Sequence, residues 1–264
     1  MEVLLLDAYN LIHRSKSGFT KGDNRIVYNF FRNLRPIIEK FNPDKVYFVL
    51  EGYPKFRALI DNDYKSNRKK QDDFFVDQKN KIINIVSECM PFEIARHPDL
   101  ECDDVIATLA SYHCKLGDKC TIVSSDSDFI QVLNLFDRVA LYNPVKKLEI
   151  EKPPYDYVTW KALRGDSSDN ISGIRGIGDK TATKLLEDPV KLTKLLEDKD
   201  NRKIFERNVN LIRLVDFSDN MGMLERHEGR SDFIMLEKIF SEMMFSSILK
   251  NTTWKKYKET FCNL

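Results

Sequence analysis

The sequence is poor in the residues that build disulfide scaffolds and fibrous proteins. It has five cysteines, an odd number with no CxxC pair, and only 10 glycines and 9 prolines in 264 residues. No secretory leader pattern opens the sequence, so the cysteines indicate a reduced compartment, and we expect a cytoplasmic protein. The longest apolar runs, such as residues 3–6, are too short to span a bilayer, which excludes a membrane-spanning class.

The overall charge alone does not indicate a protein that binds polyanions. Lys and Arg total 42 against 41 Asp and Glu, for a net charge of +1. The charges are nevertheless segregated along the chain: residues 65–70 are strongly basic, whereas residues 101–104 and 126–128 are acidic. With 42% hydrophobic and 31% charged residues, the composition is that of a globular protein of roughly one or two domains.

Short apolar runs alternate with helical patterns over the first part of the chain. The runs cover residues 3–6, 46–50, 121–124 and 139–142, and helical periodicity covers about 24–40, 79–89 and 103–115. This alternation predicts an α/β fold with a mostly parallel central sheet flanked by helices. After Pro153-Pro154 only helical periodicity continues, so we predict a core domain over 1–152 and a helical region over 153–264.

Carboxylates follow the apolar runs or begin a predicted helix. The carboxyl ends of parallel strands meet at one edge of a sheet, so these side chains are expected to converge there. Taken alone, each pair could be only a helix cap or a turn. Together, crowded carboxylates without clustered His or Cys favour hard divalent cations, and we expect two Mg²⁺ or Mn²⁺ ions. The candidate ligands are Asp7, Glu51, Glu101, Asp103, Asp104, Asp126, Asp128, Asp166 and Asp169.

A basic segment follows the second apolar run. Its cations could hold phosphates and its tyrosine could stack on a base, although a solvated loop paired with Asp72 and Asp73 is the alternative. The segment contains Lys55, Arg57, Tyr64, Lys65, Arg68, Lys69 and Lys70, of which Arg57, Tyr64, Lys69 and Lys70 are the candidate DNA-binding residues.

A glycine-rich turn at residues 173–182 leads into a predicted helix. Gly176 and Gly178 would let a phosphate approach the backbone amides at the start of this helix, and Lys180 adds positive charge. The pattern is typical of a helix–hairpin–helix that grips duplex DNA, and an ordinary turn between helices is the alternative.

Four motifs together resemble the 5′-nuclease superfamily of flap endonucleases, DNA polymerase I-type 5′→3′ exonucleases, and phage exonucleases or ribonuclease H relatives. They are YKSNR at 64–68, ECDD at 101–104, SSDSDF at 124–129 and GDSSDNISGIRGIGDKTA at 165–182. The resemblance runs from Asp7 to about Leu186, in the family's order. Two departures are Glu51-Gly52, where relatives usually carry Asp-Gly, and Ser124-Ser125 before Asp126, where a Gly is common.

The resemblance implies a PIN-like nuclease core, a helical arch over about 55–90, and a K⁺-binding helix–hairpin–helix over about 165–190. It further implies that Asp7, Glu101, Asp103 and Asp126 surround the catalytic metal pair. Asp104, Asp128, Asp166 and Asp169 would bind the ions directly or hold the groups that do. Lys65 and Arg68 would act on the scissile phosphate, Arg57 would contact another phosphate, and Tyr64 would be a stacking platform. The host would be a bacterial cell or a phage-infected cell.

The function expected on this basis is a structure-specific 5′ nuclease. Its substrates would be DNA with 5′ flaps or 5′ ends and RNA primers in RNA:DNA hybrids, and it would act as a monomer with replication proteins in trans. The four histidines form no HxxxH pattern, which favours metal-assisted over histidine catalysis. Two alternatives remain: a PIN-like single-stranded ribonuclease, and a catalytically silent DNA-binding scaffold.

Overall fold

The computed structural model describes residues 1–18, 21–262 and 264. Its central element is a seven-stranded sheet in the order β6-β5-β4-β1-β2-β3-β9, in which the five inner strands are parallel and both edge strands are antiparallel. The α/β fold with a mostly parallel sheet, expected from the sequence, is therefore confirmed. The strands are β1 (Glu2–Asp7), β2 (Lys45–Val49), β3 (Glu93–Arg96), β4 (Lys119–Val123), β5 (Val139–Asn143), β6 (Leu148–Glu149) and β9 (Glu225–Glu228).

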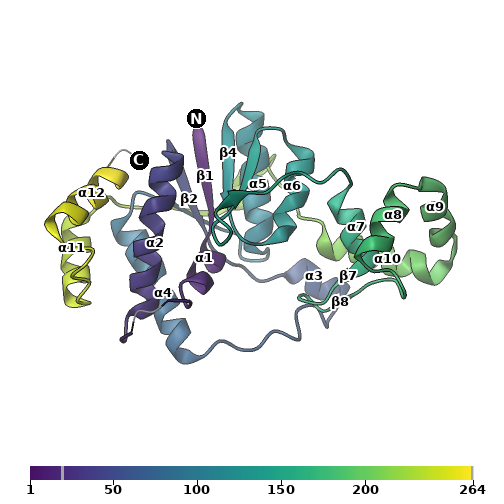
Figure 1. The fold of residues 1–264 in the computed structure, drawn as a ribbon, viewed down its shortest axis with the longest axis horizontal. Coiled ribbons are helices and arrows are strands. Elements are labelled where there is room, and N and C mark those ends of the chain that lie inside the picture. Colours follow the sequence, from purple (N-terminus) through teal and green to yellow (C-terminus); the bar gives the residue numbers. More distant parts are fainter. Residues whose placement is uncertain (19–20, 263) are drawn as a thin grey trace.

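Helices cover both faces of this sheet (Figure 1). In β1, Leu4 and Leu6 pack with one set of helices and Val3 and Leu5 with the other, which is why the strand is apolar throughout. The first face carries α1 (Ala8–Arg14), α2 (Arg25–Phe41), α4 (Asp73–Cys89), α11 (Phe233–Glu242) and α12 (Asn251–Phe261); the second carries α5 (Cys102–Lys115) and α6 (Ile130–Leu135).

A smaller helical group lies at one end of the molecule, on the right in Figure 1. It packs around two small apolar clusters and includes the short antiparallel pair β7 and β8. Its elements are α3 (Lys55–Ile60), α7 (Tyr157–Arg164), β7 (Gly165–Asp166), β8 (Ile171–Ser172), α8 (Asp179–Leu186), α9 (Pro189–Glu197) and α10 (Lys199–Ile212). Two 3₁₀ turns, at Ser127–Phe129 and Met221–Met223, complete the assignment.

The last forty residues return to the core, which the sequence did not predict. Strand β9 pairs with β3, and α11 and α12 contribute Leu236, Phe240, Trp254 and Tyr257 to the cluster on the α2 side. The sequence of β9 is ERHE. All four residues are exposed and none is apolar, so the sequence pattern does not indicate a strand there. The boundary near residue 152 stays a prediction, but residues 225–262 do not join the helical group.

The segment expected to form an arch contains two helices with different surroundings. Helix α3 lies with the helical group, whereas α4 packs on the sheet through Phe75 and Ile82. Residues 61–72 between them are turns and coil, and Figure 1 shows this stretch passing below the carboxyl ends of the strands. In the described part of the chain, no helix combines the length and the apolar character needed to cross a membrane.

Candidate active site

Five of the predicted carboxylates lie at the carboxyl end of the sheet, and we refer to them as the first acidic group. Asp7 ends β1, Glu51 follows β2, Asp126 follows β4, and Glu101 and Asp103 lie at the start of α5. Asp7 and Glu101 are only 5% and 4% exposed, so their charges are largely removed from water. The parallel topology thus brings together residues that lie as much as 119 positions apart in the chain.

The charges of this group act strongly on one another. Burial, with the charge of Asp126 adding to it, raises the pKa of Asp7 to about 6. Burial and the charges of Asp126 and Asp7 raise the pKa of Asp103 well above its usual value. Burial and Glu101 raise the pKa of Glu51 to about 7. A cation bound among these carboxyl groups would relieve both the repulsion between them and the cost of burying their charges.

Hydrogen bonds set the orientation of Asp7 in particular. Its Oδ2 accepts from Ser124 Oγ at 2.7 Å and its Oδ1 from the Asn10 amide at 3.0 Å, while Cys102 Sγ lies 3.7 Å from Oδ1. Ser124 comes one position before Ser125, where the resemblance led us to expect a glycine, and the hydroxyl of Ser124 makes this positioning contact with Asp7. The carboxylate of Glu51, by contrast, has no hydrogen bond or ion pair within the described residues.

A second acidic group consists of Asp128, Asp166 and Asp169. One carboxylate oxygen of each lies within 4.8 Å of the others, a spacing that suits a shared metal ion. Lys161 of α7 contacts Asp128 and lies 2.6 Å from Asp166 through its Nζ. Burial raises the pKa of Asp128 to about 6 despite Lys161. For Asp166 the hydrogen bonds from Lys161 and Ser168 outweigh burial and lower the pKa to about 2.

Lys161 is not among the site residues predicted from the sequence. It lies on α7 and is only 2% exposed. Its ammonium group contacts two predicted metal ligands, Asp128 and Asp166. The available signal was its place among apolar residues of the helical pattern, between Val158 and Ala162, which would bury its side chain.

Lys65 connects the two acidic groups, and Arg68 pairs with the second of them. The Lys65 ammonium contacts Glu101 of the first group and lies 3.6 Å from Asp169 of the second. Arg68 Nη2 is 2.6 Å from Asp169. The backbone amide of Lys65 also donates to the Asp169 carbonyl at 3.0 Å, and Lys65 has a positive φ of 57°. The basic segment therefore lies over both carboxylate groups, with Lys69 and Lys70 beside it and exposed.

Tyr64 has a different environment from the open stacking platform that we expected. Its hydroxyl donates to Glu101 Oε2 at 2.9 Å, and its ring packs against the apolar cluster around Val158 and Ile212. A ring held in this way positions Glu101 instead of offering a free face to a base.

Arg57 and Asp104 also require a correction. Arg57 is 3% exposed, and both its Nη atoms donate to Asp104, at 2.6 and 2.8 Å. It further donates to Glu101 and to the carbonyls of Leu211 and Arg213. Arg57 thus has no free donor for a DNA phosphate, and Asp104, fully buried, uses its oxygens on Arg57 and on backbone amides. The Arg57–Asp104 pair lies behind Glu101, in the protein interior. It joins the start of α5 to the end of α10.

The glycine-rich turn lies between α7 and α8, as the sequence predicted. Gly176 has a φ of +81°, a conformation that favours glycine, and a side chain on Gly178, the residue that caps α8, would meet no atom within 4 Å. No side chain caps α8, and Lys180 in its first turn is exposed. The amides at this helix start are open to an anion.

Two family models match the chain. The 5′-3′ exonuclease N-terminal resolvase-like domain matches residues 2–159, and the 5′-3′ exonuclease C-terminal SAM fold matches residues 152–224. A 5′-3′ exonuclease of Mycoplasmopsis pulmonis is 32% identical over 206 residues, which cover 74% of this chain and 69% of that protein. The thermostable DNA polymerase I of Thermus thermophilus is 33% identical over 210 residues, again 74% of this chain. Only 25% of the polymerase is matched, so the chain spans about a quarter of such relatives.

Solved structures agree on the fold. The T5 5′-exonuclease with bound zinc superposes with a TM-score of 0.69 at 18% identity, covering 92% of this chain and 98% of that one. The catalytic core of Rad2 in complex with DNA substrate superposes with a TM-score of 0.61 at 15% identity, covering 94% and 90%. Since the two family models together account for residues 2–224, the chain belongs to the 5′-3′ exonuclease family.

Proposed function

We propose that the protein is a structure-specific 5′ nuclease that hydrolyses phosphodiester bonds at 5′ flaps and 5′ ends, including RNA primers in RNA:DNA hybrids. The observation that carries this proposal is the pair of acidic groups at the carboxyl end of the sheet, joined by Lys65 of the basic segment. Relatives named as 5′-3′ exonuclease and DNA polymerase I, and neighbours solved with divalent ions or with DNA substrate, support it.

The donor set fits divalent ions. All the candidate ligands are carboxylates, and several have raised pKa values in the metal-free protein because they are buried together. Asp7, Glu51, Glu101, Asp103 and Asp126 would hold one ion, and Asp128, Asp166 and Asp169 a second. When bound, two Mg²⁺ ions would supply an activated water and neutralise charge on the phosphodiester.

The basic side chains would bind the phosphates of the substrate directly. Lys65 lies between the two acidic groups, where it can donate to a phosphate oxygen as negative charge develops there. Arg68 would hold the same phosphate from the more exposed side. The turn at Gly176–Gly178, with Lys180 and an accompanying K⁺, would hold the duplex backbone away from the cut.

The direct test compares a 5′-labelled flap, a nicked duplex and a single-stranded RNA, each with Mg²⁺ or with EDTA. We expect cutting near the flap junction with Mg²⁺ and none with EDTA, because the acidic groups cannot hold a phosphate without a cation. Cutting of single-stranded RNA alone would instead indicate the PIN-like ribonuclease. Tight DNA binding with no cutting in either condition would indicate the silent scaffold.

Lys65→Ala should slow cleavage by about 100-fold while substrate binding weakens only modestly. The ammonium is expected to act mainly on charge that develops in the transition state, so kcat should fall more than KM rises. Lys119→Ala is the matched control, because Lys119 is exposed at the opposite end of the sheet and forms an exposed ion pair with Glu2. Single-turnover rates on the flap substrate measure the effect, and an unchanged rate would refute this assignment.

A further inference from the structure

A polar cavity of about 270 Å³ lies between the outer side of α2 and the start of α12, remote from the acidic groups; we refer to it as the α2–α12 cavity. Both family models end by residue 224, so the α12 side of this cavity lies outside the matched residues. The polar residues lining it are Arg32, Arg35, Ser247, Thr253, Tyr28 and Tyr257, and no carboxylate lines it.

The hydroxyl of Tyr257 indicates that this cavity binds a ligand. Tyr257 is 1% exposed, and its buried hydroxyl has no hydrogen-bond partner in the described part of the chain. Its ring is fixed by stacking on Trp254, with the centroids 5.5 Å apart. Leaving a buried hydroxyl unpaired costs free energy, and burial raises the pKa of Tyr257, so the group is a neutral donor that lacks an acceptor.

The charges around this hydroxyl favour an anion as the acceptor. Arg32 is exposed and forms no hydrogen bond or ion pair with the residues that the structure describes, while Arg35 donates through one nitrogen to Glu39 at 2.7 Å and keeps its other donors. Helix α12 begins beside the cavity without a side-chain cap and without an acidic residue in its first turn. Its first amides and its dipole therefore add to the positive potential.

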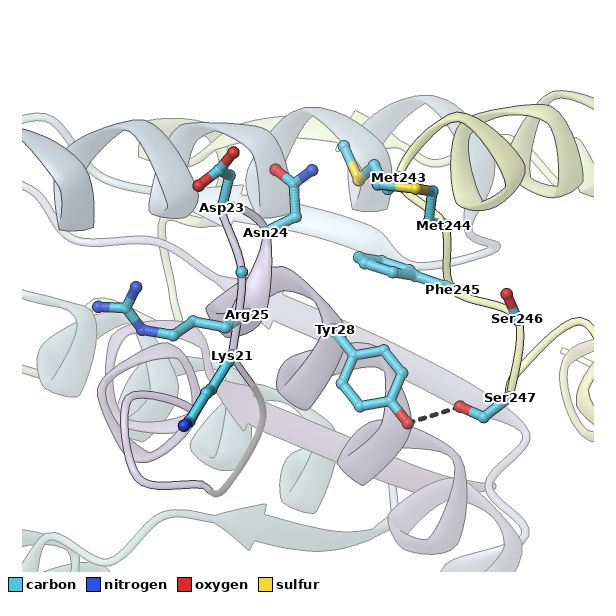
Figure 2. Close-up of a pocket in the computed structure, with 11 residues that line it drawn as sticks. Lys21, Asp23, Asn24, Arg25, Tyr28, Met243, Met244, Phe245, Ser246 and Ser247 are labelled. Carbon is cyan, nitrogen blue, oxygen red and sulfur yellow. Dashed lines mark hydrogen bonds between the residues drawn. The ribbon is translucent and has the colours of Figure 1, made fainter.

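A second cavity adjoins this one near the start of α2, and Figure 2 shows the residues that line it. The two share Tyr28 and Ser247, whose hydroxyl oxygens are 2.6 Å apart. The second cavity, of about 380 Å³, leads to the start of α2, where Lys21 and Arg25 lie near a single carboxylate, Asp23. Figure 1 places this end of α2 on the same side of the molecule as the carboxyl ends of the strands.

We propose that the α2–α12 cavity binds a phosphate group, held by Arg32, Arg35 and the Tyr257 hydroxyl. Because the neighbouring cavity is lined by Lys21 and Arg25, a nucleic-acid strand is the source that fits best, and this part rests on the proposed function. Inorganic phosphate or a mononucleotide would offer the same chemistry, and the phosphate site itself does not depend on nuclease activity.

The test uses the fluorescence of Trp254, which stacks on Tyr257. In a Trp160→Phe background Trp254 is the remaining tryptophan, because the chain has two. Inorganic phosphate is titrated in EDTA at constant ionic strength, and we expect a saturable change. Arg32→Ala and Tyr257→Phe should each weaken it by about tenfold, since each removes a hydrogen bond to a charged group. Lys255→Ala is the matched control, because Lys255 lies on α12, is exposed and does not line the cavity.

The outcomes separate the parts of the proposal. The phosphate site would be overturned by the absence of saturable binding, or by equal binding in the parent and both variants when their thermal unfolding is also equal. A short single-stranded DNA that lowers the apparent phosphate affinity supports the strand as the source. If the DNA has no effect on the phosphate titration, the strand is rejected and the source is free phosphate or a nucleotide. Because EDTA is present throughout, none of these results depends on cleavage.

Discussion

Asp126→Asn is expected to slow Mg²⁺-dependent cleavage of a 5′ flap by more than about 100-fold without loss of the fold. Loss of an outer contact to a metal ligand typically costs 10–100-fold, and Asp126 is proposed as a ligand itself. Asparagine has nearly the same shape and retains the oxygen that accepts from the Asp128 amide at 2.9 Å. What it removes is the charge that, in addition to burial, raises the pKa of Asp7 and Asp103.

Whereas cleavage by Asp126→Asn should be slower, its stability without metal should not fall. Without the Asp126 charge the remaining carboxylates repel one another less, so the metal-free variant should unfold at a temperature equal to or above that of the native chain. Added Mg²⁺ should raise its unfolding temperature less than that of the native chain, because stabilisation by a ligand follows its affinity.

Asp137→Asn is the control for this pair of measurements, because Asp137 is exposed on the turn between α6 and β5. Cleavage at the native rate in Asp126→Asn would remove Asp126 from the proposed metal site. A lower unfolding temperature in EDTA would show that the residue is needed for the fold, and the loss of cleavage would then carry no information on the metal.

The convergence of carboxylates could be predicted because it depends on strand ends. A buried strand must be apolar, and the first charged residue after it marks the point where the chain leaves the sheet. Asp7, Glu51 and Asp126 follow that rule, and the parallel order of β1, β2 and β4 places them together. Their binding of metal ions stays a prediction.

The partners of the charged residues could not be predicted in the same way. Nothing in the local sequence distinguishes Arg57, which is buried on Asp104, from Arg68, which is half exposed on Asp169. The pairing depends on the packing of α3 against α5 and α10, segments distant in the chain. For the same reason Tyr64 and Lys161 acquire their roles only when α7 and the basic segment pack against the sheet edge.

The packing of residues 225–262 on the core domain is another feature that the local sequence pattern does not predict. The apolar face of α11 was recognisable as a core face, but the pattern does not say which core it joins. Strand β9 is held by backbone pairing with β3 and by side chains such as Arg226, which contacts Glu93. Edge strands of this kind need no apolar alternation, so sequence periodicity does not detect them.

Arg57→Met is expected to lower the free energy of unfolding by about 4 kcal/mol, the middle of the range for removing one partner of a buried ion pair. For a chain of this size that corresponds to roughly 10 °C in the unfolding temperature. The loss is large because the fully buried Asp104 would lose its ion-pair partner, and because the carbonyls of Leu211 and Arg213 would lose their donors. Chemical denaturation with matched m-values measures it.

Arg68→Met makes the same chemical change in a different environment. Arg68 is 55% exposed at the side chain, so the loss of its pair with Asp169 should cost less than about 1 kcal/mol. The two variants should therefore separate stability from chemistry: Arg57→Met mainly lowers stability, and Arg68→Met mainly lowers the rate of cleavage. Replacing Asp104 with leucine in the Arg57→Met chain should recover part of the lost stability, because both charges are then absent. If both single variants lost the same small amount, Arg57 would not be the residue that joins α5 to the end of α10, and the site would depend on other contacts for its support.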